Sequence, residues 1–197
     1  MSHVIEAKQA HAFLLIASKK AHHESFHAFL KAVDIISLES RIDKSLSLKH
    51  FLVKTIISQQ VSVKAAASIW SKVKNVLDHH PPAISIDLLR DQGLSKPKAS
   101  YVLGIMQNTE LEKLSIADLK KLSLGELSQS LLALKGVGPW TLGVVRMFYV
   151  QDTDVFLEGD LGINKALEHF FKSKKYSGKH YAPYRTYLCL YLWKSLS

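Results

Sequence analysis

The residues best suited to chemistry in this chain are two closely spaced glycines and one acid further along. Gly136 and Gly138 stand in the run from Leu131 to Thr141, between two segments of helical pattern. A Gly-x-Gly turn leaves bare backbone N–H groups at the start of the second helix, and such a helix start binds anions. The chain carries 26 Lys plus Arg against 17 Asp plus Glu, a formal net charge of +9. The anion that we expect is therefore a nucleic-acid phosphate.

The acid is Asp160, which directly precedes a helical pattern over Leu161 to Phe171. An Asp at this position is commonly a plain N-cap, whose side chain accepts a hydrogen bond from a backbone amide. A carboxylate beside a phosphate-binding hairpin can also stabilise positive charge that develops on a deoxyribose ring. Position alone leaves both interpretations open.

Histidines and lysines offer weaker candidates. His23 and His27 have the i,i+4 spacing of a metal-binding pair, but no third ligand is apparent in the sequence. We therefore expect a solvated helix face there and no metal site. A basic cluster nearer the C-terminus could contact DNA or form a solvated loop. It consists of Lys172, Lys174, Lys175 and Lys179.

The elements that must position these residues are helices. Apolar residues recur at three- and four-residue spacing along most of the chain, for example at Ala12, Leu15 and Ile16, and alternating strand patterns are scarce. The pattern predicts an all-α fold of about ten helices. Helix starts are marked by capping boxes and by prolines that suit a first turn. These are Ser115-x-x-Asp118, Ser123-x-x-Glu126, Pro97, Pro139 and Pro183.

Composition limits the class of protein. With 197 residues, 47% of them hydrophobic, the chain can form one compact unit or two small lobes with a real core. The lone Cys189 excludes an intrachain disulfide and a four-thiolate iron–sulfur cluster. The sequence shows neither an export signal nor an apolar run of membrane-spanning length. We expect an intracellular protein that does not enter a membrane, cytoplasmic in a bacterium or nuclear in a eukaryote.

The segment from Leu131 to Lys165 resembles the helix-hairpin-helix, Gly/Pro-rich loop and catalytic Asp of the base-excision DNA glycosylase superfamily. Within that superfamily the chain is most similar to the DNA-3-methyladenine glycosylase II family. Three further matching stretches follow the order of the family's motifs. They are Ile56 to Ala66, Gly93 to Tyr101, and Ala182 to Arg185 with Tyr191 to Trp193.

The resemblance implies two helical lobes, residues 47–150 and residues 1–46 plus 151–197, with an active-site cleft between them. It assigns Asp160 as the catalytic Asp and places Trp140 and Trp193 in the base pocket. It assigns Gln60 with Gln59 to the wedge that fills the gap left in the duplex by the flipped nucleotide. It assigns phosphate binding to Gly136, Val137, Gly138 and Thr141. Without the family, Gln59 and Gln60 indicate only a polar helix junction, and Trp193 only core packing.

The function that the resemblance implies is a monofunctional DNA glycosylase that flips out and excises alkylated purines such as 3-methyladenine. It would act as a monomer on damaged double-stranded DNA and need no cofactor. In members that also cut the strand, a lysine occupies the place of Trp140, so we expect only the glycosidic bond to break. Val144 stands where some relatives carry an aromatic pocket wall, which leaves the preferred base open.

Two alternatives remain. One is a glycosylase of the same fold that acts on uracil, hypoxanthine or oxidised bases. The other is a non-catalytic helix-hairpin-helix module that only binds DNA. Asp160 and the Gln59-Gln60 pair favour catalysis, because simple phosphate binding needs neither.

Overall fold

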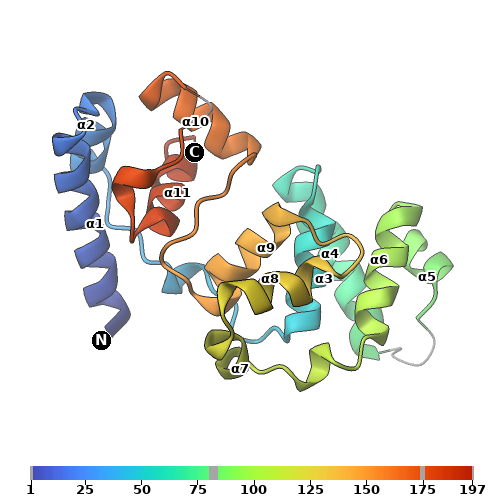
Figure 1. Cartoon of the computed structure of the whole chain (residues 1–197). Coiled ribbons are helices and arrows are strands. Elements are labelled where there is room, and N and C mark those ends of the chain that lie inside the picture. Colours follow the sequence, from blue (N-terminus) through green and yellow to red (C-terminus); the bar gives the residue numbers. More distant parts are fainter. Residues whose placement is uncertain (1, 80–83, 174–175, 197) are drawn as a thin grey trace. The chain divides into compact units, whose positions relative to one another are not determined.

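The protein folds as two units of helices. The computed structural model describes residues 2–79, 84–173 and 176–196, and these contain no strand (Figure 1). One unit comprises residues 44–145, and the other comprises residues 1–43 with 146–197. The sequence predicted the divisions at 46/47 and 150/151. No helix in the described part of the chain is long and apolar enough to cross a membrane.

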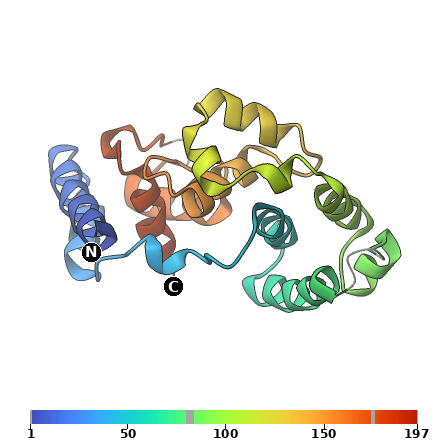
Figure 2. The same ribbon diagram turned by 90° about the horizontal axis from the view of Figure 1, so that it is seen from below.

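The unit of residues 44–145 is built around one central helix, α3 (Leu48–Ser58), most of whose residues are buried. Phe51, Leu52, Val53, Ile56 and Ile57 are among them. A helix with so much buried apolar surface must be enclosed by others. α3 packs against α4, α6 and α9, and Figure 2 shows α4 running beside it. The surrounding elements are α4 (Val63–His79), α5 (Ile86–Asp91), α6 (Lys96–Gln107), η3 (Leu111–Lys113), α7 (Ile116–Lys121), α8 (Leu124–Leu132) and α9 (Pro139–Val145).

Local signals set the helix starts in this unit as the sequence predicted. Ser115 and Ser123 each form a full capping box with the acid three residues later, at α7 and α8. Pro97 lies in the first turn of α6, and Pro139 is the first residue of α9. A proline in a first turn removes an amide that has no helical acceptor, so it costs little.

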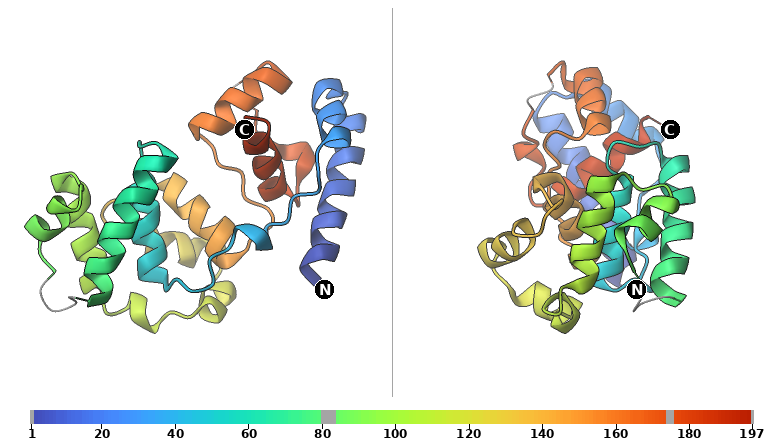
Figure 3. Two further views of the ribbon diagram at one scale, coloured as in Figure 1. Left: turned by 180° about the vertical axis from the view of Figure 1, so that it is seen from behind. Right: turned by 90° about the vertical axis from the view of Figure 1, so that its right-hand side faces the viewer.

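The unit of residues 1–43 with 146–197 also has an enclosed helix, α11 (Arg185–Lys194). Every side chain from Thr186 to Leu192 is buried. α11 packs against α1 and α10, and Figure 3 shows α1 beside it. The other elements are α1 (Ser2–Lys20), α2 (Glu24–Ala32), η1 (Glu39–Arg41), the π-helical turn η4 (Arg146–Val150), α10 (Leu161–Phe171) and η5 (Lys179–Tyr181).

Two predictions about helices were wrong. The buried face of α1 is formed by Ala7, Ala10, Leu14 and Ala17, whereas Ile16 is 57% exposed. Small alanines allow α1 to approach its neighbours closely, and a search for large apolar residues misses such a face. Pro183 lies in a turn, because α11 begins only at Arg185 and the amide of Tyr184 donates to the carbonyl of Tyr181.

The predicted solvated histidine face was also wrong. His23 precedes α2 and packs among Phe171, Tyr176 and Tyr181, with its Nδ1 2.8 Å from the Tyr181 hydroxyl. Burial lowers the pKa of His23. His27 Nδ1 lies 2.9 Å from the hydroxyl oxygen of Ser18. These imidazoles join α1 and α2 to the C-terminal segment, and among the described residues no three His, Cys, Asp or Glu side chains group as a metal would require.

Candidate active site and nucleic-acid interface

The predicted hairpin lies between α8 and α9, and it requires glycine at Gly136. Its φ of +87° is in the left-handed region. A Cβ there would stand 2.5 Å from Cδ2 of Tyr101, whose ring extends from α6 and packs against the turn. Both the backbone conformation and the space therefore exclude a side chain. Tyr101 is the last residue of the matching stretch Gly93 to Tyr101, but nothing in the sequence indicated that it contacts the hairpin.

Gly138 is different, because its φ is not positive and a Cβ built on it meets no atom within 4 Å. The turn itself therefore needs one glycine, where the sequence predicted two. Val137 is 6% exposed, and its amide donates to the carbonyl of Leu134 at 3.1 Å. The amide of Val137 is thus used within the turn, and its predicted contact with a phosphate stays a prediction. The open space over Gly138 leaves its backbone accessible.

Gln59 and Thr141 fasten the hairpin to α3. The side-chain amide of Gln59 donates to the carbonyl of Gly136 and to Oγ1 of Thr141, both at 3.0 Å. Thr141 is 1% exposed. These bonds give both side chains a structural role, whereas the wedge role of Gln59 and the phosphate role of Thr141 stay predictions. Buried polar groups of this kind need such partners.

Gln60 keeps the properties expected of a wedge. It directly follows the C-cap residue of α3, its side chain is exposed, and its φ is +56°. A left-handed conformation is disfavoured for a residue with a Cβ, so neighbouring groups must hold it. Its predicted place in the duplex remains a prediction.

Asp160 is the N-cap of α10, and one of its carboxylate oxygens is held by two N–H donors. Oδ1 accepts from the amide of Ile163 at 2.8 Å and from Nε1 of Trp193 at 2.9 Å. The Trp193 ring lies nearly parallel to that of Phe148, with ring centres 6.2 Å apart. A Cβ on Gly162 would stand 3.0 Å from Trp193 Cδ1, so glycine there lets the indole approach the acid. Trp193 thus belongs to the site of the acid and is only half-buried.

The loop that carries Asp160 is fastened along α11. Arg185 makes two hydrogen bonds to the carboxylate of Asp154, at 2.7 and 2.8 Å. The amide of Val155 donates to Thr186 Oγ1 at 3.1 Å, and the Cys189 thiol donates to the Val155 carbonyl. The Arg185 guanidinium holds the pKa of Asp154 below its usual value. Burial raises the pKa of Cys189 to about 12, so its thiol is inert.

Sequence reasoning missed Phe148, Asp154 and Thr186. Arg185 stood in a matched motif, but nothing in the sequence pairs it with an Asp in a preceding loop. The remaining predicted positions keep their assignments as predictions. Trp140 is half-buried in the first turn of α9. Lys172 and Lys179 are exposed, and Lys174 and Lys175 lie outside the described residues.

Known structures resemble this chain over most of its length, although no protein-family model matches it. The DNA-3-methyladenine glycosidase of Bacillus halodurans is 27% identical with a TM-score of 0.72, and the match covers 93% of this chain and 88% of that one. The Schizosaccharomyces pombe 3-methyladenine DNA glycosylase Mag1, solved in complex with abasic DNA, is 26% identical with a TM-score of 0.67, covering 75% and 79%. The fold is that of a helix-hairpin-helix DNA glycosylase.

Sequence relatives narrow this class further. The alkylbase DNA glycosidase-like protein mag2 of Schizosaccharomyces pombe is 30% identical over 161 residues, which cover 73% of this chain and 75% of that protein. The chain belongs to the DNA-3-methyladenine glycosylase family. It spans between 35% and 75% of the length of the curated relatives that it matches.

Proposed function

We propose that this protein is a DNA glycosylase that flips a damaged nucleotide out of the duplex and excises alkylated purines such as 3-methyladenine. The observation that carries the proposal is the carboxylate of Asp160, oriented by the Ile163 amide and the Trp193 indole. A pure phosphate-binding module has no use for an acid supported in this way. The sequence resemblance also assigns the catalytic Asp of the family to this position.

Alkylation gives the purine a positive charge, and aromatic faces attract cations. Stacking on Trp140 or Trp193 would then contribute about 1–2 kcal/mol once the base is desolvated. Phe148, whose ring lies nearly parallel to that of Trp193, adds apolar surface beside it. Neutral bases gain less from these rings, which accounts for selectivity toward alkylated bases.

The chemistry required of the protein is modest, because an alkylated base is already a good leaving group. The bond between C1′ of the sugar and the base nitrogen breaks, and the base departs with the electron pair. Asp160 stabilises the positive charge left on the sugar and orients a water molecule, whose oxygen bonds to C1′ as it loses a proton. No cofactor takes part in these reaction steps.

DNA is held through its backbone in this proposal. The amides of Gly136 and Gly138 donate to no backbone carbonyl within the described residues, and the net charge of +9 favours a polyanion. Phosphate contacts of this kind position the duplex without reading its sequence. Gln60 fills the space that the flipped nucleotide vacates. The proposed partner is therefore damaged duplex DNA inside the cell, bound by one copy of the chain.

The product that we propose is an intact strand with an abasic site. Trp140 occupies the place of the lysine that forms a Schiff base in members that cut the strand, and indole has no nucleophilic amine. Borohydride treatment during reaction with lesion-containing DNA should leave no protein covalently attached. A trapped adduct would show that a lysine elsewhere acts as a nucleophile.

Chromatography of the bases released from methylated DNA tests the function directly. We expect 3-methyladenine in the soluble fraction with the native protein and none with the heat-inactivated protein. Duplexes containing uracil, hypoxanthine or an oxidised guanine are treated in parallel. Release of one of these bases without 3-methyladenine would favour the related glycosylase activities, and DNA binding without any release would favour the non-catalytic module.

A further inference from the structure

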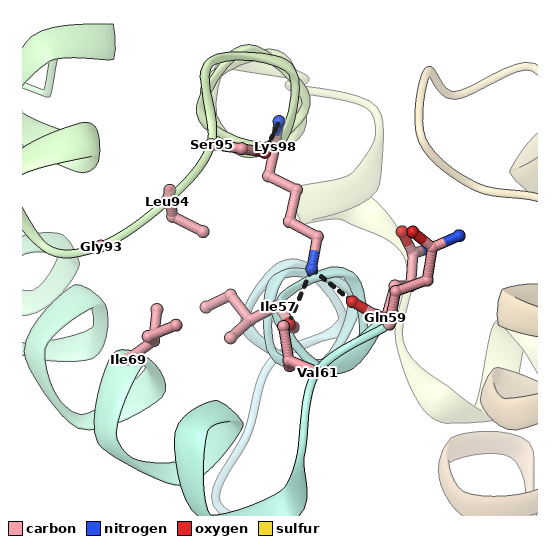
Figure 4. A pocket seen from close by; sticks show the side chains of 9 residues that line it. Ile57, Gln59, Val61, Ile69, Gly93, Leu94, Ser95 and Lys98 are labelled. Atoms are coloured by element: carbon pink, nitrogen blue, oxygen red, sulfur yellow. Dashed lines mark hydrogen bonds between the residues drawn. The ribbon is translucent and has the colours of Figure 1, made fainter.

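Lys98 closes the C-terminal end of α3. Its Nζ donates to the carbonyl of Ile57 at 2.9 Å and to the carbonyl of Gln59 at 2.6 Å (Figure 4). The last carbonyls of a helix have no N–H donor within the helix, and they carry the negative end of its dipole. An ammonium group satisfies both needs, so Lys98 acts as a cap supplied by a different helix, α6.

The side chain of Lys98 reaches α3 across a cavity. This cavity has a volume of about 260 Å³, and its lining includes the apolar side chains of Ile57, Ile69 and Leu94 (Figure 4). Among the residues that line it, Lys98 carries the only charge.

The bond to the Gln59 carbonyl matters for the residue that follows. The carbonyl of Gln59 and the nitrogen of Gln60 belong to one planar peptide group. Lys98 therefore fixes the plane from which Gln60 begins its left-handed turn. The side chain of Gln59 is fastened independently to the hairpin through Gly136 and Thr141. The backbone before Gln60 is thus held on two sides, while the Gln60 side chain stays exposed.

We propose that Lys98 is a positioning residue for the duplex wedge. It holds the backbone of Gln60 in the conformation that presents its amide side chain to the gap left by a flipped nucleotide. This proposal rests on the proposed function, since it requires that Gln60 enter such a gap. Lys98 itself, with its ammonium group committed to two carbonyls, would not contact DNA.

Equilibrium binding tests this role without requiring excision. The dissociation constant is measured by fluorescence anisotropy for an undamaged duplex and for the same duplex containing a tetrahydrofuran abasic analogue. The ratio of the two constants reports how well the wedge fills the gap. We expect Lys98→Met to lower the preference for the abasic duplex by about tenfold, as fits the loss of charge-assisted hydrogen bonds, while binding to the undamaged duplex stays within about threefold.

Two comparisons separate positioning from other roles. Gln60→Ala should lower the same ratio, and the double variant should lower it no further, because the two residues act on one contact. Lys96→Met, which removes an exposed charge from the first turn of the same helix, should leave the ratio unchanged and weaken both complexes equally.

Two outcomes would overturn the proposal. One is an unchanged ratio in Lys98→Met, whether or not both duplexes bind more weakly, and the other is additive effects of Lys98→Met and Gln60→Ala. If Lys98→Met does not fold, Lys98→Gln, which keeps a donor without the charge, is judged by the same ratio. If the native protein releases no base but these ratios behave as expected, the proposed function fails and the wedge assignment stands.

Discussion

At the scale of residues, the site depends on how one carboxylate is held. Asp160 caps α10 through the Ile163 amide and also accepts from the Trp193 indole. A plain N-cap would need only the first of these bonds. The second comes from a helix far along the chain, and it orients the acid relative to an aromatic face. The Asp160 side chain can therefore cap α10 and, as we propose, stabilise positive charge on the sugar at the same time.

Replacing Trp193 by Phe should separate orientation from stacking. Trp193→Phe keeps an aromatic ring beside Phe148 but loses the donor to Asp160. We expect the single-turnover rate of base release to fall about tenfold, in line with about 1.5 kcal/mol for a hydrogen bond to a charged group. The thermal midpoint should change little, since the ring is only half-buried. An unchanged rate would show that the indole N–H does not orient the acid.

The two hairpin glycines should respond differently to the same change. Gly136→Ala meets the Tyr101 ring and a positive φ, so it should destabilise the fold by about 2 kcal/mol or more. Gly138→Ala has open space and should alter stability by less than about 0.5 kcal/mol. The Gly138 variant should instead bind damaged and undamaged duplexes equally weakly, about tenfold below the native protein. Denaturant melts and anisotropy titrations measure the two effects, and native-like DNA binding by Gly138→Ala would contradict the phosphate role.

At the scale of elements, the enclosed helix of each unit positions the functional residues of that unit. Gln59 and Gln60 directly follow α3, so the enclosed helix of this unit leads into both the hairpin tie and the proposed wedge. α11 holds the loop before α10 through Arg185, Thr186 and Cys189, and Trp193 then reaches the acid itself. Supporting groups on buried helices keep a site within narrow geometric limits.

The fastening of this loop should depend on pH. Arg185 lowers the pKa of Asp154 below its usual 3.8, so the unfolded chain takes up the proton more readily than the folded protein. The ion pair therefore contributes fully above about pH 4, and its contribution is lost as the pH falls through the lowered folded-state pKa. Asp154→Asn should cost about 1 kcal/mol of unfolding free energy at pH 7 and clearly less at pH 3. Urea melts at the two pH values measure this, and an equal cost at both would exclude the ion pair as the cause.

The sequence predicted the local features of these elements and missed most of the long-range ones. The helix over Leu161 to Phe171, its cap at Asp160 and the two capping boxes follow from neighbouring residues alone. His23 was misjudged because its partner Tyr181 comes from a distant segment. The bonds from Gln59 to the hairpin were missed, because spacing along the chain cannot show that its side-chain amide turns toward Gly136 and Thr141.

At the scale of the whole molecule, the two units divide the proposed work. Residues 44–145 contain the hairpin and Gln60, which we propose contact the DNA backbone and the duplex gap, and Lys98, which we propose positions Gln60. Residues 1–43 with 146–197 contain Asp160, Trp193 and Phe148, which we propose face the sugar and the base. DNA binding should therefore survive changes to the acid, and base release should not.

The most direct test of this account is the single-turnover release of 3-methyladenine from duplex DNA by Asp160→Asn. Asn is as good an N-cap as Asp, so the variant should keep the thermal midpoint and bind an abasic duplex within about threefold of the native protein. Loss of the charge should remove about 3–4 kcal/mol of transition-state stabilisation, so release should fall by about 100- to 1000-fold. Release at the native rate by a folded, DNA-binding Asp160→Asn variant would contradict the assignment of Asp160 and the mechanism built on it.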